Sequence, residues 1–170
     1  LRRSSAASDV YKRQEKDYVV VGETNESMLK KGFISVGKKF PVYLHPQTKE
    51  EYALARKEKK VSSGHKGFIF ETNNSVSLEE DLYRRDLTIN AIAQDENGIL
   101  VDPFEGQKDL KNKLLKHVSP AFSEDPLRVF RVARFHAKLK YLDFKIEEKT
   151  LEQMQAISSS DELGVLSKER

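Results

Sequence analysis

Two carboxylates stand just before an apolar run near the start of the chain. Glu15 and Asp17 flank one lysine, and Asp17 opens "DYVVVG", a short β-branched segment that is apolar on both faces, as expected of a central strand. Because residues two apart on a strand point to the same side, the two carboxylates would converge on one point. Such a pair suits Mg²⁺, so the segment predicts a metal site, with a solvated strand end as the alternative. Glu51 is a further candidate carboxylate beside this pair.

A second candidate is the segment "SLEEDLYRRDLTINAI", residues 77–92. It predicts a long helix that begins with a capping box formed by Ser77 and Glu80. Its apolar side chains fall on one stripe at the helical period, and Arg85 falls in the centre of that stripe. A buried guanidinium is costly unless an anion pairs with it. Either a carboxylate of the fold or an anionic ligand is therefore expected at Arg85, and the pattern leaves both open.

The same predicted helix carries two more polar side chains that could serve a site. Asp86 and Asn90 are four residues apart, so they share a face beside the one that holds Arg85. Arg84 is expected to point away from both. Asp86 and Asn90 are therefore candidates for the site of Arg85, and Arg84 is not.

A third candidate is "SEDPLRVFRVARFHAKL", residues 123–139, which predicts another long helix. Arg128, Arg131 and Arg134 step by three, so their guanidiniums fan across an arc of the helix. Apolar residues surround that arc, so the three arginines cannot all lie on a free solvent face. Asp125 either pairs with Arg128 as a structural contact, or the two present a planar donor–acceptor pair to a nucleobase edge or a phosphate.

The remaining pattern predicts strands that alternate with helices. Strands are expected at residues 17–22, 33–37, 40–45, 50–56 and 98–104, and helices at residues 24–32, 77–92, 109–118 and 123–139. Residues 57–67 are charged and contain Gly and Ser, which predicts a loop. The predicted fold class is therefore α+β, with a mixed β-sheet flanked by helices.

Composition and length limit the class of protein. The 170 residues include no cysteine, which excludes disulfides and thiolate metal sites and fits a reducing compartment. The longest apolar run, "YVVV", is far too short to span a membrane, so we expect a cytoplasmic protein without membrane contact. The length fits one domain, or one domain and the beginning of another.

The excess of basic residues is confined to the amino-terminal end. Residues 1–14, "LRRSSAASDVYKRQ", hold four basic side chains and one acidic one, and the rest of the chain holds 26 of each. These fourteen residues lack helical or strand periodicity, so we expect them to be a non-native tail. The net charge therefore gives no indication of RNA binding.

Five segments together carry a resemblance to a known family: "DYVVVG", "VGKKFPVYLHPQTKEEYALAR", "LEEDLYRRDLTINAIAQD", "DPFEGQKDL" and "HVSPAFSEDPLRVFRVARF". They resemble the amino-terminal half of a bacterial CCA-adding enzyme, the class II tRNA nucleotidyltransferase of the polymerase-β nucleotidyltransferase superfamily. The resemblance runs from about Glu15 to the end of the chain. It implies a mixed-sheet nucleotidyltransferase head followed by the start of an all-helical neck. It also implies Mg²⁺ as cofactor, tRNA as partner, and addition of C, C and A from CTP and ATP.

The resemblance also implies roles for individual residues. Glu15 and Asp17 would hold Mg²⁺ and act in catalysis, with Glu51 as a third carboxylate beside them. The residues implied at the nucleotide are Arg85, Asp86, Asn90, Asp125, Arg128, Arg131 and Arg134. Among these, Asp86 would lie near the ribose hydroxyls, and Asp125 with Arg128 would read the edge of the base.

Two departures from the family pattern shape the expectation for this chain. Glu15 stands where the family usually has Asp, and residues 1–14 stand where the family has a glycine- and arginine-containing segment that meets the triphosphate. We expect residues 15–117 to form the head and residues 118–170 to begin the neck. We also expect this polypeptide to be a piece of the enzyme that adds no CCA alone. The alternatives are a bacterial poly(A) polymerase and a non-catalytic RNA-binding module of the same superfamily.

Overall fold

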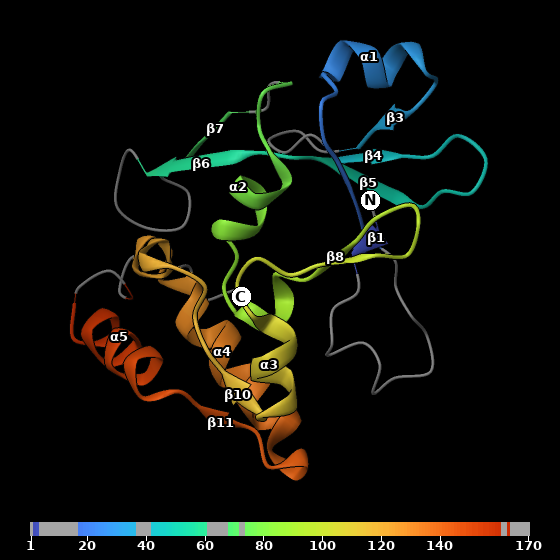
Figure 1. The fold of residues 1–170 in the computed structure, drawn as a ribbon. Helices are drawn as coiled ribbons and strands as arrows, with labels where there is room; N and C mark the ends of the chain where they lie inside the picture. Colours follow the sequence, from blue (N-terminus) through green and yellow to red (C-terminus); the bar gives the residue numbers. More distant parts are fainter. Residues whose placement is uncertain are drawn as a thin grey trace.

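A mixed sheet of seven strands forms one half of the molecule in the computed structural model, which describes residues 2–3, 17–36, 42–60, 68–71, 74–160 and 163 (Figure 1). The strand order across the sheet is β3 (Ile34–Ser35), β4 (Val42–Leu44), β5 (Glu51–Leu54), β2 (Asp17–Val20), β1 (Arg2–Arg3), β8 (Ala93–Gln94) and β9 (Leu100–Val101). The β2–β5 pair is parallel and its neighbours are antiparallel. The predicted mixed sheet is confirmed.

The strand β2 lies inside the sheet, as its sequence predicts. Val19 is buried against Ala55 and Val76, and the parallel register pairs Tyr18 with Tyr52. The two tyrosine rings stack with centroids 4.4 Å apart, so side chains at matching positions of the two strands share a face. The prediction of a strand at residues 50–56 is confirmed by β5, which has the same direction as β2.

The sheet includes two residues of the tail that the sequence predicts to be non-native. Arg2 and Arg3 form β1, which pairs antiparallel with β2 on one side and with β8 on the other. The non-native origin of this tail stays a prediction, but Arg2 and Arg3 lie in a strand although residues 1–14 lack strand periodicity. The physical reason is that a gap between two strands leaves main-chain N–H and C=O groups unpaired, and any extended segment can pair with them regardless of its side chains.

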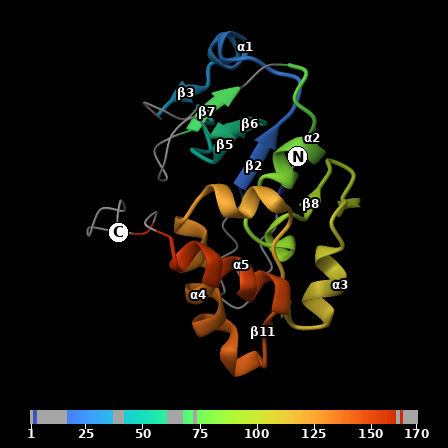
Figure 2. The same ribbon diagram turned by 90° about the vertical axis from the view of Figure 1, so that its left-hand side faces the viewer.

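The helices lie around and below this sheet (Figures 1 and 2). They are α1 (Asn25–Lys30), α2 (Leu78–Tyr83), α3 (Gly106–Lys111), α4 (Leu127–Leu139) and α5 (Glu148–Ser158). In both views α2 lies between the sheet and α4. Three short 3-10 helices, η1 (Thr88–Asn90), η2 (Pro120–Glu124) and η3 (Lys140–Leu142), and two strand pairs complete the fold. The pairs are β6 (Lys57–Lys60) with β7 (Phe68–Glu71), and β10 (Leu114–Leu115) with β11 (Lys145–Ile146).

The long helix predicted over residues 77–92 is wrong in its second half. The capping box of Ser77 and Glu80 is present, but α2 ends at Tyr83. The chain then runs beside a later segment: Leu87 pairs with His117, and the Thr88 N–H donates to the Lys116 carbonyl at 2.9 Å. These tertiary main-chain bonds replace the helical ones, which the periodicity of the side chains could not reveal.

Three other boundaries also differ from the prediction. The strand β6 occupies the first part of the loop predicted at residues 57–67, and residues 61–67 lie outside the described residues. The helix predicted at residues 109–118 is α3, which ends at Lys111 and gives way to β10. The helix predicted from residue 123 begins at Leu127, after η2.

The largest hydrophobic cluster joins the segment after α2 to the carboxy-terminal helices. It includes Leu87, Ile89 and Leu115 together with Phe122 of η2, and apolar residues of α4 and α5 such as Val132. Residues on both sides of position 117 therefore share one core, and the division into head and neck at that position stays a prediction. Among the described residues, none of the helices has the length and apolar character needed to cross a membrane.

The segment "DPFEGQKDL" fixes η1 against α3. The Asp102 carboxylate accepts the main-chain N–H groups of Gly106 and Gln107 at 2.7 and 2.9 Å and so caps α3. The Thr88 hydroxyl of η1 donates to the buried Asp109 carboxylate of α3 at 2.8 Å. A Cβ atom at Gly106 would lie 2.2 Å from the Thr88 carbonyl oxygen, so only glycine allows this approach.

We expect Gly106→Ala to lower the free energy of unfolding by roughly 1–3 kcal/mol or more, because the added methyl group forces η1 and α3 apart. Urea denaturation measures this. Lys108→Ala is the matched control, since it shortens an exposed side chain of the same helix whose ion pair with Glu105 is also exposed. Equal stability of Gly106→Ala and the unchanged chain would contradict the close contact.

Candidate functional site

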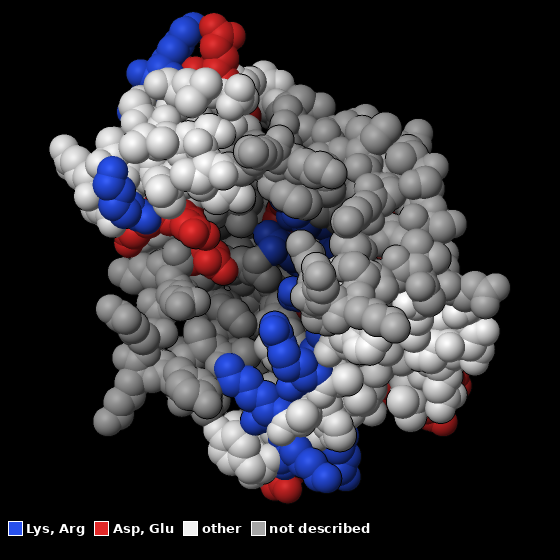
Figure 3. Space-filling view, turned by 180° about the vertical axis from the view of Figure 1, so that it is seen from behind, with Lys and Arg blue, Asp and Glu red and all other residues white. Residues whose placement is uncertain are grey.

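A cleft of about 490 Å³ lies between the start of β2, the end of α2 and the first turns of α4. Its lining residues are Asp17, Arg56, Arg84, Arg85, Asp86, Asn90, Asp125, Leu127, Arg128, Arg131 and Phe135. Seven of the residues that the sequence assigns to a site are among them. Seen from behind the view of Figure 1, basic side chains gather in and beside a hollow of the surface (Figure 3).

Arg85 reaches the cleft and also has a carboxylate partner. Its Nη2 lies 2.6 Å from Asp81 Oδ2, an oxygen of a side chain that is only 1% exposed. The Nε of Arg85 is buried and has no hydrogen-bond partner among the described residues. Both alternatives for Arg85 thus describe part of its environment, since a carboxylate of the fold pairs with it while its guanidinium lines an open cleft.

Asp81 is the shared partner of two arginines that line the cleft, and sequence reasoning missed it. Burial alone would raise the pKa of this carboxyl, but the charges of Arg84 and Arg85 lower it to about 2. Asp81 therefore stays ionised inside the protein and compensates two positive charges. A sequence signal existed, because Asp81 precedes Arg84 by three residues and Arg85 by four, the spacings at which helical side chains meet.

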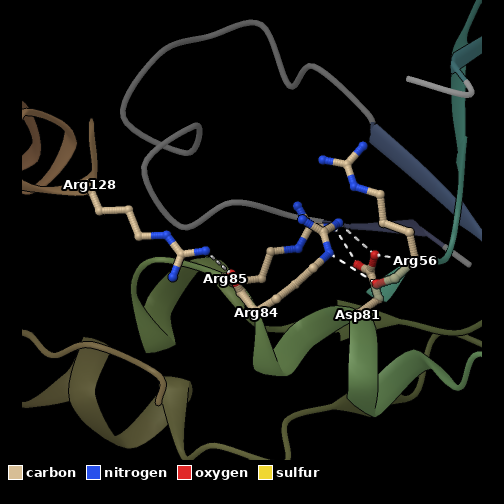
Figure 4. A network of polar contacts seen from close by, with 5 residues as sticks. All are labelled: Arg56, Asp81, Arg84, Arg85 and Arg128. Atoms are coloured by element: carbon tan, nitrogen blue, oxygen red, sulfur yellow. Dashed lines mark hydrogen bonds and ion pairs between the residues drawn. The ribbon is translucent and has the colours of Figure 1, made fainter. Parts of the chain in front are cut away.

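Arg84 does not point away from the site, contrary to the expectation from a continuous helix. Its Nη2 lies 2.6 Å from Asp81 Oδ1, and its Nε donates to the Arg56 carbonyl at 3.2 Å. Arg84 follows Asp81 by three residues and Arg85 follows it by four, so both side chains turn toward the same carboxylate. Figure 4 shows this network, in which the two arginines approach Asp81 together.

Asp86, Asn90 and Arg131 form a second polar group in the cleft. Asp86 is 4% exposed; its Oδ1 accepts from the Leu87 N–H and from Asn90 Nδ2, and its Oδ2 accepts from Arg131 Nε at 2.7 Å. Burial raises the pKa of Asp86, but the ion pair with Arg131 and these hydrogen bonds bring it below its ordinary value. The predicted proximity of Asp86 and Asn90 is observed, although a turn and η1 provide it rather than one helix.

Asp125 and Arg128 both line the cleft. Asp125 lies before the first residue of α4, and Arg128 is the second residue of this helix. Asp125 Oδ1 accepts the Leu127 N–H at 3.0 Å, so this carboxylate caps the helix. The buried Arg128 donates to the main-chain carbonyls of Ala121 and Arg84, each at 2.5 Å. Arg128 also borders a neighbouring cavity of about 630 Å³, which lies between α2 and η2 and shares Arg84 with the cleft.

The structure describes two of the three carboxylates predicted at the metal site. Asp17 opens β2 and lines the cleft, whereas Glu15 lies outside the described residues. Glu51 opens β5, and the register of Tyr18 with Tyr52 makes Asp17 and Glu51 the preceding positions of two adjacent parallel strands. The described part of the chain contains no group of three or more His, Asp or Glu side chains that could hold a metal. One or two carboxylates fit Mg²⁺, which usually takes its other ligands from water and substrate phosphates.

Arg134 is not among the residues that line the cleft. It lies on an exposed part of α4, one turn beyond the half-exposed Arg131. The fan of three arginines therefore runs from the buried Arg128, through Arg131 at the cleft, to Arg134 in solvent. A role for Arg134 at a ligand stays a prediction.

The cleft is suited to a polyanion with a planar polar part. Five arginine side chains line it, against three carboxylates, two of which already pair or cap. A guanidinium binds phosphate oxygens through two parallel N–H···O hydrogen bonds, and a low local dielectric constant strengthens each of them. A carboxylate and a guanidinium at the start of α4 add acceptors and donors of the kind that recognise the edge of a base.

A mixed sheet with carboxylates at the start of its parallel strands and an arginine-lined cleft beside it defines a nucleotidyltransferase head. The chain belongs to the poly A polymerase head domain family, whose model matches residues 10–116. It is 61% identical over 156 residues to the CCA-adding enzyme of Alteromonas mediterranea, a match that covers 92% of this chain and 39% of that protein. The chain thus spans well under half the length of this curated relative.

Two solved structures have the same fold. The crystal structure of the Bacillus stearothermophilus CCA-adding enzyme in complex with CTP matches with a TM-score of 0.72 and 25% identity, over 98% of this chain and 40% of that one. A tRNA nucleotidyltransferase complexed with a primer tRNA and an incoming ATP analog matches with a TM-score of 0.64 and 30% identity, over 96% and 47%. These matches confirm the predicted fold class and the resemblance to CCA-adding enzymes.

The low pKa of Asp81 predicts how stability depends on pH. The folded carboxyl has a pKa of about 2 against an ordinary 3.8, so its contribution is complete above pH 3.8 and is lost as the pH falls toward 2. We expect Asp81→Asn to lack this contribution of roughly 2 kcal/mol. The difference in free energy of unfolding between the unchanged chain and Asp81→Asn should therefore shrink between pH 5 and pH 2 in urea titrations. A difference that stays constant over this range, as expected for the exposed control Glu79→Gln, would contradict the assignment.

Proposed function

We propose that this chain carries the nucleotide site of an enzyme that adds C, C and A to the 3′ end of tRNA from CTP and ATP. The observation that supports this most is the cleft itself, in which β2, the segment after α2, and α4 bring together Asp17 and six polar residues assigned to the nucleotide. The relatives support it by their names, since one is a CCA-adding enzyme in complex with CTP and another was solved with a primer tRNA. Such an enzyme would work on tRNA in the cytoplasm.

In this proposal the arginines hold the nucleotide. Arg85 and Arg84 enter from the end of α2 and Arg131 from α4, so positive charge faces the cleft from two elements. The triphosphate is the part of CTP or ATP whose charge matches them. Asp86 would hold the ribose, and its position is set by three hydrogen bonds that leave its carboxylate little freedom.

Mg²⁺ would be held by Asp17 and Glu15, with Glu51 on the adjacent strand as a further carboxylate. When bound, the ion would supply charge neutralisation of the triphosphate and activation of the 3′-hydroxyl of the tRNA. The protein's own contribution is to keep carboxylate oxygens at the end of a rigid strand in the sheet, facing the arginines across the cleft. This arrangement favours positioning as the main source of catalysis.

The second candidate function is a poly(A) polymerase, because the family model that matches the chain describes the head domain of such enzymes. Both functions would use the same cleft and the same metal. They differ in the nucleotide, since a poly(A) polymerase would prefer ATP throughout. Incorporation of CMP onto a tRNA that lacks CCA separates the two.

A chimaera tests the proposed function directly. Residues 15–170 of this chain would replace the matching part of the Alteromonas mediterranea CCA-adding enzyme, of which the chain matches 39%. The chimaera is given labelled CTP or ATP, Mg²⁺ and tRNA without CCA. Addition of two C residues and one A supports the proposal, whereas addition of A alone favours the poly(A) polymerase. No addition by a folded chimaera would overturn both.

We expect Asp17→Asn to remove the Mg²⁺ dependence of CTP binding by this chain. The substitution keeps the size of the side chain but removes a charged oxygen ligand, so affinity in Mg²⁺ should fall to the level measured with a chelator. Isothermal titration calorimetry measures both affinities. Glu26→Gln, an exposed carboxylate of α1, is the control and should bind as the unchanged chain does. Retention of the full Mg²⁺ effect in Asp17→Asn would remove Asp17 from the metal site.

We expect Asp125→Asn to blunt the choice between CTP and ATP in the chimaera by about tenfold, because one hydrogen bond to a charged group is worth roughly 1.5–3 kcal/mol. Asparagine keeps an oxygen that can accept the Leu127 N–H, so the helix cap survives. Competition between the two labelled nucleotides measures the ratio of incorporation. An unchanged ratio, together with a loss of stability in Asp125→Ala, would assign Asp125 to helix capping alone.

A further inference from the structure

Asp81 occupies a central position among the arginines of the cleft, although it does not line the cleft itself. It lies in the last turn of α2 and is 1% exposed, beneath the two guanidiniums that do line it. Each of its oxygens pairs with a different arginine: Oδ1 with Arg84 Nη2 and Oδ2 with Arg85 Nη2, both at 2.6 Å. Oδ1 also accepts the Arg56 N–H at 3.2 Å.

We propose that Asp81 is a positioning residue of the nucleotide site, which orients Arg84 and Arg85 toward the anionic part of the bound nucleotide. This inference rests on the proposed function. Figure 4 shows the arrangement, with Arg84 and Arg85 converging on Asp81 while Arg128 approaches from the side of α4. Asp81 thus acts on the ligand only through the two arginines.

The two guanidiniums need such an anchor. Arginine side chains have many rotamers, and two adjacent positive charges repel each other, so without a shared partner they would separate into solvent. Each has only 14–16% of its side chain exposed in the structure, although burial opposes its charge. A single buried carboxylate holds both in place and leaves an excess of one positive charge over the pair.

The Arg85 guanidinium retains donors for a ligand after pairing with Asp81. A guanidinium has five N–H donors, and the ion pair uses Nη2. The buried Nε of Arg85 has no partner within the described part of the chain, a state that costs free energy unless a ligand or water supplies an acceptor. The unpaired Nε belongs to a side chain that lines the cleft, where an oxygen-rich ligand would supply the missing acceptor.

The network also includes the main chain of the residue that precedes the β6–β7 pair. Arg56 directly precedes β6, and its main chain is held on both sides: its N–H donates to Asp81, and its carbonyl accepts from Arg84. The Asp81 carboxylate therefore fixes one wall of the cleft and two of its donors at once. Loss of this carboxylate should disturb ligand binding more than it disturbs the distant helices.

The inference predicts a change in the affinity for a polyanion that is opposite to the change expected from net charge alone. If Asp81 were only a counterion that competes with the ligand, its neutralisation would strengthen the binding of a polyanion, because one negative charge is lost. If Asp81 positions the arginines, neutralisation weakens binding in spite of that loss. The direction of the change in affinity therefore separates the two.

The experiment measures binding of CTP and of inorganic triphosphate, each with Mg²⁺, to the 170-residue chain by calorimetry. We expect Asp81→Asn to weaken both by about tenfold or more, since each arginine loses a charged contact that fixes it. Asp81→Glu keeps the charge but moves it by one methylene, so a smaller loss in the same direction is expected. Glu79→Gln is the matched control, because it removes an exposed negative charge from the same helix and should leave both affinities unchanged.

Circular dichroism and urea titration of each variant separate a loss of fold from a loss of position. If Asp81→Asn does not fold, Asp81→Glu decides the question, and binding equal to that of the unchanged chain overturns the proposal. Equal or tighter binding of triphosphate by a folded Asp81→Asn overturns it too. If the unchanged chain binds neither ligand, the proposed function fails. If the unchanged chain and the folded Asp81 variants bind equally well, only the positioning role of Asp81 fails.

Discussion

The pairing of the segment after α2 with residues 116–118 is the interaction on which the site depends. The Thr88 N–H donates to the Lys116 carbonyl, the Val118 N–H lies 3.4 Å from the Asp86 carbonyl, and Leu87 pairs with His117 between them. These bonds end α2 at Tyr83 and bury the five residues from Asp86 to Asn90 in the interior. The same bonds join the sheet half of the molecule to the helices, so the cleft forms where the two halves meet. A continuous helix over residues 77–92 would have placed Arg84, Arg85 and Asp86 on different faces.

Buried charge gives this site its rigidity before any ligand arrives. Asp81 compensates Arg84 and Arg85, and Asp86 compensates Arg131, so five charged groups in or beneath the cleft are already paired. Removing Asp81 would leave two largely buried guanidiniums without their shared carboxylate, which is more costly than never having buried the group. Because the arginines are fixed in advance, the triphosphate of the proposed substrate would not need to reorganise them, and its binding free energy would serve to align the reacting groups.

The sequence predicts the site residues better than it predicts the elements that carry them. Period-two and β-branched patterns correctly indicate β2 and β5, since such signals depend on local burial alone. The apolar stripe over residues 77–92 correctly indicates burial but not the end of the helix at Tyr83, because tertiary main-chain bonds to residues 116–118 override the periodicity. Asp81 escaped attention since a carboxylate among "LEEDLY" looks like an ordinary acidic first turn. The structure shows that it pairs with Arg84 and Arg85, which follow it by three and four residues.

Arg128 illustrates why the residues that would select a base also hold the fold. A side chain that replaces a template must be immobile, since each additional rotamer would present a different pattern of donors to the base. The structure provides this rigidity through the bonds from Arg128 to the carbonyls of Ala121 and Arg84, which fix the guanidinium on both of its terminal nitrogens. The second of these bonds also connects α4 to the arginine pair at the end of α2. In the proposed function, the parts of the cleft assigned to the base and to the phosphates are therefore connected through this hydrogen bond, and a substitution at Arg128 would alter both together. Within the described part of the chain, the Asp125 side chain accepts one hydrogen bond, the helix-capping bond from the Leu127 N–H, so it is the position at which selectivity can be separated from folding.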